Sequence, residues 1–136
     1  MNILYCGDKP MQKGILLSSM SLIGNVEEPL NIYILTVDYS EKGVNYNPVD
    51  KAFAKYMERK LNKLDSEVNV FLVDVTRYFV EELPEANMQS RFTACCMLRL
   101  IADKTDIKER VLYLDTDVLC RKDFSDFYYQ NMDGIE

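Results

Sequence analysis

Several kinds of binding site can be set aside because the chain lacks their residues. It contains no histidine, and its four cysteines, at positions 6, 95, 96 and 120, form no C-x-x-C pair. Structural zinc sites are built from cysteine and histidine at such spacings, so the sequence argues against one. The patterns G-x-G-x-x-G and G-x-x-x-x-G-K-[ST] are also absent, which argues against a Rossmann dinucleotide site and a Walker nucleotide triphosphatase.

Positive charge and long apolar runs are scarce as well. The 136-residue chain has 16 basic and 22 acidic residues, for a formal net charge of −6. A nucleic-acid partner is therefore not expected, because such proteins present a basic face, although a local arginine or a metal ion can hold an anionic small ligand in an acidic protein. No transmembrane segment of ~20 apolar residues and no signal-peptide pattern is visible. We expect a cytoplasmic protein with free, buried thiols.

Apolar runs of two different periods alternate along the chain. Short runs rich in β-branched and aromatic residues predict strands at 3–6, 30–37, 68–73 and 111–114. Longer runs with helical spacing predict helices at 11–24, 49–64, 91–102 and 123–129. The stretches expected to be irregular are 38–48 and 74–89. Alternating strands and helices, in a chain of single-domain length, predict an α/β fold whose mainly parallel sheet is flanked by helices.

Two acidic residues follow the last predicted strand. Asp115 and Asp117 come directly after the apolar run at 111–114, and ligands of parallel sheets bind at the carboxyl ends of strands. Since residues two apart on an extended chain point the same way, both carboxylates can face one ion. Carboxylate oxygens suit Mn²⁺ or Mg²⁺, which can also coordinate a diphosphate. The alternative is a pair of solvated acids at a strand end.

Two further charged residues occupy positions that could serve a ligand. Arg99 lies in the predicted helix 91–102, which is apolar almost all the way round and should therefore be buried. A buried arginine needs an anionic partner, for which Asp115 or a bound ligand is the natural choice, with a structural salt bridge as the alternative. Asp8 follows the first strand, where it could bond a base or ribose, or act as a turn or cap residue.

Three stretches of the sequence carry a family resemblance. They are residues 2–8 (NILYCGD), 97–100 (MLRL) and, above all, 110–119 (RVLYLDTDVL). In this order they resemble the family 8 retaining glycosyltransferases, which include bacterial lipopolysaccharide galactosyl- and glucosyltransferases and glycogenin. The resemblance implies a GT-A (Rossmann-like) fold, a UDP-sugar donor carrying galactose or glucose, and a metal-dependent hexosyl transfer with retained anomeric configuration. The implied acceptor is a glycan or glycolipid, as in lipopolysaccharide biosynthesis.

The same resemblance assigns roles to individual residues. It implies that Asp115 and Asp117 bind Mn²⁺ or Mg²⁺, and that Arg99 and Asp115 act as catalytic residues beside the donor sugar. The implied contacts to the nucleotide sugar are Cys6, Asp8 and Thr116. Family members draw a third metal ligand, a histidine, and the acceptor site from a C-terminal half. We therefore expect residues 1–136 to be the donor-binding part of a GT-A domain that is incomplete at its C-terminus, and to be poorly active alone.

Two other functions compete for the same residues. An apolar strand followed by D-x-D-x-V is also typical of haloacid-dehalogenase-type phosphohydrolases, in which Asp115 would be the nucleophile and Asp117 the general acid. That fold places the motif near the start of its domain and requires a downstream lysine, for which Lys122 is too close. The non-catalytic alternative is a nucleotide-sugar-binding module, which would bind UDP with Mn²⁺ but neither hydrolyse nor transfer the sugar.

Overall fold

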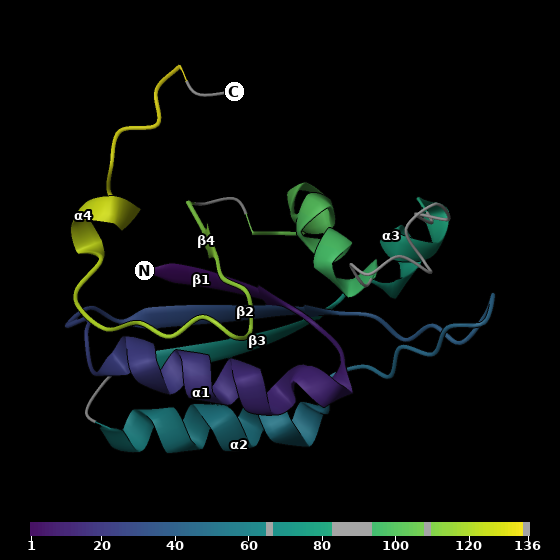
Figure 1. Ribbon diagram of the computed structural model, residues 1–136, viewed down its shortest axis with the longest axis horizontal. Helices are drawn as coiled ribbons and strands as arrows, with labels where there is room; N and C mark the ends of the chain where they lie inside the picture. The colour runs from purple at the N-terminus through teal and green to yellow at the C-terminus, as the bar shows by residue number, and fades with distance from the viewer. Residues whose placement is uncertain (65–66, 83–93, 108–109, 135–136) are drawn as a thin grey trace.

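A four-stranded sheet forms the centre of the molecule (Figure 1). The structure is a computed structural model and describes residues 1–64, 67–82, 94–107 and 110–134. In the spatial order of the sheet, the strands are β3 (Val68–Asp74), β2 (Leu30–Thr36), β1 (Asn2–Cys6) and β4 (Leu112–Tyr113). Every pair of neighbours among these four strands is parallel. The predicted α/β fold, with a parallel sheet flanked by helices, is therefore confirmed.

Helices cover both faces of this sheet (Figure 1). One face carries α1 (Gln12–Ile23) and α2 (Lys51–Leu61), and the other carries α3 (Thr76–Glu81) and the 3₁₀ helix η4 (Ala94–Lys104). The remaining short helices are η1 (Lys9–Met11), η2 (Asn62–Leu64) and α4 (Ser125–Tyr128). Because both faces are covered, all five residues of β1 are buried.

Alternate residues of β1 contribute to two separate cores. Ile3 and Tyr5 pack in the core that faces α1 and α2, whereas Leu4 and Cys6 pack in the core that faces α3 and η4. The helices add buried apolar side chains to both cores, among them Ile15, Leu22, Met57 and Leu61 to the first and Phe79, Leu98 and Ile101 to the second. Fully burying one such side chain is worth about 1.5–3 kcal/mol, so these two layers of contacts hold the helices on the sheet.

Helix α3 was not expected from the sequence. The stretch 74–89, predicted to be irregular, contains α3, so that part of the prediction is wrong. Asp74 Oδ1 accepts hydrogen bonds from the backbone N and from Oγ1 of Thr76 at 2.9 and 2.5 Å, which satisfies a donor at the start of the helix. Phe79, one turn later, is fully buried. The hydrogen bonds of Asp74 and a single buried ring therefore accompany a helix too short for its periodicity to be visible.

The other predicted helices and strands are present with different bounds. The predicted helix 91–102 is the 3₁₀ helix η4, and its residues 91–93 lie outside the described residues. The predicted strand 111–114 is reduced to the two residues of β4, and the predicted helix 123–129 to the four residues of α4. Within the described ranges, no helix is long and apolar enough to cross a membrane.

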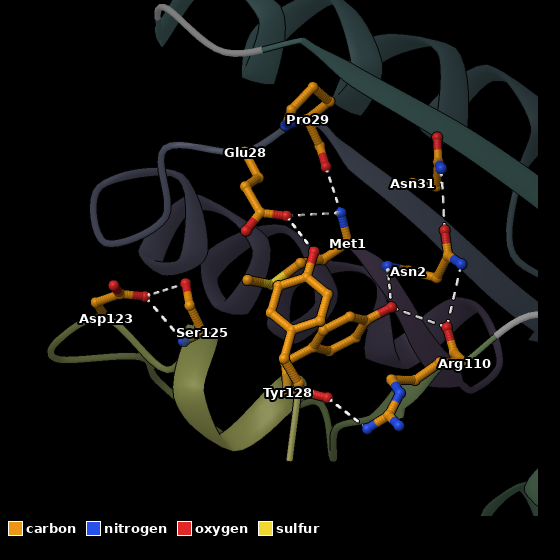
Figure 2. Close-up of polar contacts among 10 residues, drawn as sticks. Met1, Asn2, Glu28, Pro29, Asn31, Arg110, Asp123, Ser125 and Tyr128 are labelled. Atoms are coloured by element: carbon orange, nitrogen blue, oxygen red, sulfur yellow. Dashed lines mark hydrogen bonds and ion pairs between the residues drawn. The ribbon is translucent and has the colours of Figure 1, made fainter. Parts of the chain in front are cut away.

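Where the strands begin, polar side chains form a ladder across the sheet. Asn69 Nδ2 donates a hydrogen bond to Asn31 Oδ1 at 3.0 Å. Asn31 Nδ2 donates to Asn2 Oδ1 at 2.9 Å, and Asn2 Nδ2 donates to the carbonyl oxygen of Arg110 at 3.1 Å (Figure 2). The three asparagines are direct partners in the register of β3, β2 and β1. The ladder therefore links these strands to the residue that leads into β4.

Tyr128 of α4 joins this ladder (Figure 2). Its buried hydroxyl accepts a hydrogen bond from Asn2 N at 3.0 Å and donates one to Arg110 O at 2.8 Å. Arg110 Nη1 in turn donates to the carbonyl oxygens of Tyr128 and Gln130 at 2.8 and 2.7 Å. Most polar groups at this end of the sheet are therefore paired within the protein, as buried polar groups must be.

The segment that follows β4 lies along α1 (Figure 1). At Gly14 the approach is so close that a Cβ atom would stand 2.6 Å from the carbonyl oxygen of Thr116. Two turns further along the helix, Ser21 Oγ accepts a hydrogen bond from Cys120 N at 2.8 Å. Helix α1 therefore holds residues 116–120 in place, and a residue without a side chain is required at position 14.

Candidate functional site

Asp8 lies directly beyond β1, at the carboxyl edge of the sheet, and is buried. The turn around it is fixed on both sides: Gly7 N donates to Leu35 O at 3.0 Å, and Lys9 N donates to Asn47 O at 2.8 Å. Burial raises the pKa of the Asp8 carboxyl above its usual range, because desolvation disfavours the charged form. The carboxylate is thus a fixed, poorly solvated hydrogen-bond acceptor at the edge where parallel sheets bind ligands.

Tyr46 and Cys95 lie close to Asp8. Burial raises the pKa of the Cys95 thiol to about 12, and the negative charge of Asp8 adds to this shift. Burial likewise raises the pKa of Tyr46, with a smaller contribution from Asp8, and the Tyr46 hydroxyl accepts a hydrogen bond from Ala94 N at 3.3 Å. Both neighbours are therefore neutral at physiological pH, and Asp8 is the charged group of this end of the site.

A second group of side chains gathers where β4 ends. The guanidinium carbon of Arg99 lies 5.1 Å from the centroid of the Tyr113 ring, a cation–π distance. The Tyr113 hydroxyl donates a hydrogen bond to Asp115 Oδ1 at 2.6 Å. Burial raises the pKa of the Cys6 thiol, while the charge of Arg99 opposes this shift and that of Asp115 adds to it. Cys6, Arg99 and Asp115 are therefore neighbours, and Tyr113 contacts both charged residues.

The expectation that Arg99 is buried is wrong, because its side chain is exposed. A 3₁₀ helix has three residues per turn, so residues three apart in η4 share a face. Cys95, Leu98 and Ile101 form the buried face, and Arg99 and Leu100 are directed outward. An aromatic ring at the surface, rather than a buried ion pair, is the contact that holds the guanidinium group.

The Asp-Thr-Asp motif forms a turn rather than an extended segment. Val118 N donates to Asp115 O at 3.1 Å and closes a turn around Thr116 and Asp117. The extended geometry predicted for the motif is therefore wrong, and strand alternation does not decide where the two carboxylates point. Both aspartates are exposed and Thr116 is half-buried. The close approach of Gly14 to the Thr116 carbonyl fixes the turn against α1.

The two aspartates of the motif are the candidate metal ligands of this edge. In the part of the chain that the structure describes, no group of three or more His, Cys, Asp or Glu side chains could hold a metal ion. Mg²⁺ in phosphate-binding sites is commonly held by one or two carboxylates, phosphate oxygens and water. The residues therefore suit a cation bound together with a diphosphate, and do not suit a cation held by protein ligands alone.

The structure gathers the predicted site residues at one edge of the sheet, in two groups. Asp8 lies beside η4 and the loop after β2, while Cys6, Arg99 and Asp115 lie together at the ends of β1 and β4. The two groups adjoin, because Cys6 and Asp8 are separated by one residue of the same turn. The roles assigned to these residues stay predictions.

Sequence reasoning missed three residues of this region. Tyr113 stands two residues before Asp115, so the alternation used to pair the aspartates could have pointed to it. Gly14 could also have been noticed, because a glycine inside a helix lowers helix stability by about 1 kcal/mol relative to alanine and therefore indicates a close packing contact. Tyr46 lies in a polar loop, where nothing in the sequence indicates that it approaches Asp8.

Comparison with known proteins gives one match. A family model described as Glycosyl transferase family 8 matches residues 2–135. No significant match was found among the curated proteins or among the solved structures. The matched range contains both groups of site residues and the Asp-Thr-Asp turn.

Proposed function

Because the chain belongs to glycosyl transferase family 8 and is a glycosyltransferase, we propose that it binds a UDP-sugar donor across the carboxyl ends of β1 and β4. The α/β sheet is consistent with the GT-A fold expected for this family. The observation that carries the proposal is the grouping of Cys6, Arg99 and Asp115 at the same sheet edge as Asp8. Open parallel sheets bind their ligands at this edge.

The nucleoside end of the donor would lie at Asp8. Its carboxylate is buried and fixed by the turn, so it can accept a hydrogen bond from the N–H of the base or from a ribose hydroxyl. Such a bond is stronger in a poorly solvated setting than in water. Cys6, two residues earlier, and Thr116 of the opposite turn would complete the contacts to the nucleotide sugar.

The diphosphate would lie at the Asp-Thr-Asp turn. Asp115 and Asp117 would contribute two carboxylates to a Mn²⁺ or Mg²⁺ ion, with diphosphate oxygens and water as the other ligands. When bound, such an ion neutralises the charge that develops on the leaving UDP. Arg99 would direct its exposed guanidinium group toward the sugar and the diphosphate from its place over the Tyr113 ring. Donor binding would thus bring negative charge to the one cationic side chain of this group.

The transfer itself would move galactose or glucose to a glycan or glycolipid, such as lipopolysaccharide, with retained anomeric configuration. The support for the sugar, the acceptor and the stereochemistry is the resemblance of residues 2–8, 97–100 and 110–119 to the retaining enzymes. We assign the whole of residues 1–136 to the donor-binding part of the fold. The family match gives no support to the phosphohydrolase alternative, in which Asp115 would form a covalent intermediate.

A nucleotide-sugar-binding module is the second candidate function. The observation that favours it is the set of only two carboxylates at the motif, with no cluster of three metal-binding groups among the described residues. A cation held by two protein ligands is bound weakly in the absence of the diphosphate. Binding of UDP with Mn²⁺, without hydrolysis or transfer of the hexose from UDP-galactose or UDP-glucose, would identify such a module.

The first experiment is a calorimetric titration of UDP into the chain, with and without Mn²⁺. We expect Mn²⁺ to tighten UDP binding at least about tenfold, equivalent to about 1.4 kcal/mol. The substitution Asp117→Ala should abolish this gain, because it removes one of the two carboxylates, and should leave the metal-independent binding unchanged.

The matched control is Asp133→Ala, which removes an exposed acid far along the chain from the motif and should keep the full effect of Mn²⁺. Equal Mn²⁺ dependence in the wild type and in Asp117→Ala would show that the motif is not the metal site. Titration with UDP-galactose and UDP-glucose, followed by analysis of the products, separates the enzyme from the binding module.

A further inference from the structure

Tyr113 is held in place independently of the residues that it contacts. It is the second residue of β4 and pairs with Leu4 of β1 in the register of the sheet. The next residue continues this anchoring, since Leu114 N donates to Leu4 O at 3.0 Å. Its ring is half-buried and packs against the core that faces α3 and η4. The ring therefore belongs to the rigid sheet, whereas Asp115 and Arg99 are exposed side chains on a turn and on a 3₁₀ helix.

Both exposed charges are in contact with this one fixed side chain. The hydroxyl donates to Asp115 Oδ1 at 2.6 Å, within the range of short, charge-assisted O–H···O bonds. The face of the ring carries the Arg99 guanidinium group at 5.1 Å. Arg99 is also hydrogen-bonded to the Tyr113 side chain, so removal of the hydroxyl leaves Arg99 its contact with the ring alone.

The hydrogen bond also makes the two aspartates of the motif unequal. Asp115 has one carboxylate oxygen engaged by the hydroxyl, which leaves Oδ2 for an ion or a donor. Asp117 is exposed in the centre of the turn. Side chains fixed before binding lose less conformational entropy when a ligand binds. The ring and the hydroxyl thus prepare one carboxylate and one guanidinium group for the same ligand.

We propose that Tyr113 is a positioning residue of the donor site, which holds the Asp115 carboxylate and the Arg99 guanidinium group in their binding arrangement through its hydroxyl and its ring. This inference rests on the donor site proposed above. Tyr113 itself needs no contact with the donor, because it acts through Asp115 and Arg99, which are proposed to contact the donor.

The test uses Tyr113→Phe, which removes the hydroxyl and keeps the ring. Loss of one hydrogen bond to a ligand-binding carboxylate should weaken Mn²⁺-dependent UDP binding about five- to tenfold. UDP binding without Mn²⁺ should weaken less, because Arg99 keeps its contact with the ring. Tyr113→Leu, which removes the ring as well, should weaken UDP binding both with and without Mn²⁺.

Two further variants keep the result specific. Tyr33→Phe removes a hydroxyl from a half-buried ring of β2, which β1 separates from β4, and where the ring stacks on Phe71 at 4.9 Å; it should leave UDP binding unchanged. Asp115→Asn removes the carboxylate charge, so Tyr113→Phe should have little additional effect on Mn²⁺-dependent binding in that background. Equal Mn²⁺ dependence of UDP binding in the wild type and in Tyr113→Phe would overturn the proposal.

A spectroscopic measurement separates this inference from the proposed function. In the free protein, the ¹³C resonance of the Asp115 carboxylate should move in Tyr113→Phe and stay in place in Tyr33→Phe. If UDP and Mn²⁺ fail to bind the wild-type chain, the proposed donor site is wrong. The Asp115 resonance still reports whether the Tyr113 hydroxyl holds the Asp115 carboxylate. A resonance that is the same in Tyr113→Phe and in the wild type would show that the hydroxyl does not hold Asp115.

Discussion

The two ends of the parallel sheet use their polar residues in opposite ways. Where the strands begin, the asparagine ladder, Arg110 and the buried hydroxyl of Tyr128 are hydrogen-bonded to one another. Figure 2 shows the part of this network from Asn31 to Tyr128. Where the strands end, Arg99, Asp115 and Asp117 are exposed, and Asp8 is a buried carboxylate with a raised pKa. One end has its polar groups paired inside the protein, and the other has three exposed charged side chains and one buried carboxylate.

This difference predicts that one end of the sheet contributes mainly to stability and the other mainly to ligand binding. Paired polar groups at the start of the strands fix the order and register of the sheet. At the other end, Arg99 and Asp115 contact the Tyr113 side chain at the surface, and the buried carboxylate of Asp8 opposes folding. Substitutions at the two ends should therefore change different measured quantities, and three experiments test that separation from the largest expected effect to the smallest.

The largest effect on stability is expected from Tyr128→Phe. The substitution removes the hydroxyl that accepts from Asn2 N and donates to Arg110 O. Loss of a partner of buried polar groups costs about 1–3 kcal/mol, so the free energy of unfolding in a urea titration should fall by this amount. UDP affinity, measured below the unfolding transition, should be unchanged.

Tyr129→Phe is the control for that experiment. Its hydroxyl donates to Glu28 Oε2 at 2.5 Å, but the side chain is exposed, and exposed substitutions usually change stability by less than about 0.5 kcal/mol. Equal losses of stability in the two variants would contradict a special role for the ladder. A loss of UDP affinity in Tyr128→Phe would show that the two ends are coupled.

A smaller effect on stability, joined to an effect on binding, is expected from Gly14→Ala. The new Cβ would stand 2.6 Å from Thr116 O, and such overpacking costs about 1–3 kcal/mol. Alanine regains about 1 kcal/mol as the better helix former, so the net loss of unfolding free energy should be about 1 kcal/mol. The Asp-Thr-Asp turn must shift, and Mn²⁺-dependent UDP binding should weaken. Gly24→Ala, where nothing lies within 4 Å of the new Cβ, should do neither.

The sequence predicted the four strands and the place of the acidic residues at the carboxyl edge of the sheet, but not the asparagine ladder at the other edge. Runs rich in β-branched residues placed the four strands correctly, because a strand buried on both faces requires such residues. Asp8 and Asp115 were placed at the carboxyl edge by the parallel topology alone. The ladder was not predictable, since Asn2, Asn31 and Asn69 become neighbours only when the register of three strands is known.

The errors arose where a local geometry replaced the assumed one. Arg99 was expected to be buried in an α-helix, but three residues per turn place Leu98 inward and Arg99 outward. Asp115 and Asp117 were expected to lie on an extended segment after the strand, but β4 ends at Tyr113 and a turn follows. Helix type and strand length depend on tertiary contacts, which hydrophobic periodicity does not contain.

The smallest effect is expected from Asp8→Asn, and its sign depends on pH. Burial raises the pKa of Asp8 in the folded protein above its unfolded value, so the folded state holds this proton more tightly. Stability from this group is then fully present below the unfolded pKa and is lost as pH rises through the folded pKa. Asparagine removes the loss, and Asp8→Asn should therefore raise the free energy of unfolding at pH 7 and have a smaller effect near pH 4.

The stability gained in Asp8→Asn should be accompanied by a loss of UDP affinity. Substitutions that stabilise a protein at a binding site often cost function, because the destabilising group serves the ligand. UDP affinity of the wild type should fall as pH drops through the raised pKa of Asp8, where the carboxylate loses its charge, and Asp8→Asn should flatten that profile. Asp38→Asn, an exposed acid beyond β2, provides the comparison in both assays. If Asp8→Asn raised the free energy of unfolding equally at pH 4 and pH 7, the destabilisation would not come from the buried charge of Asp8.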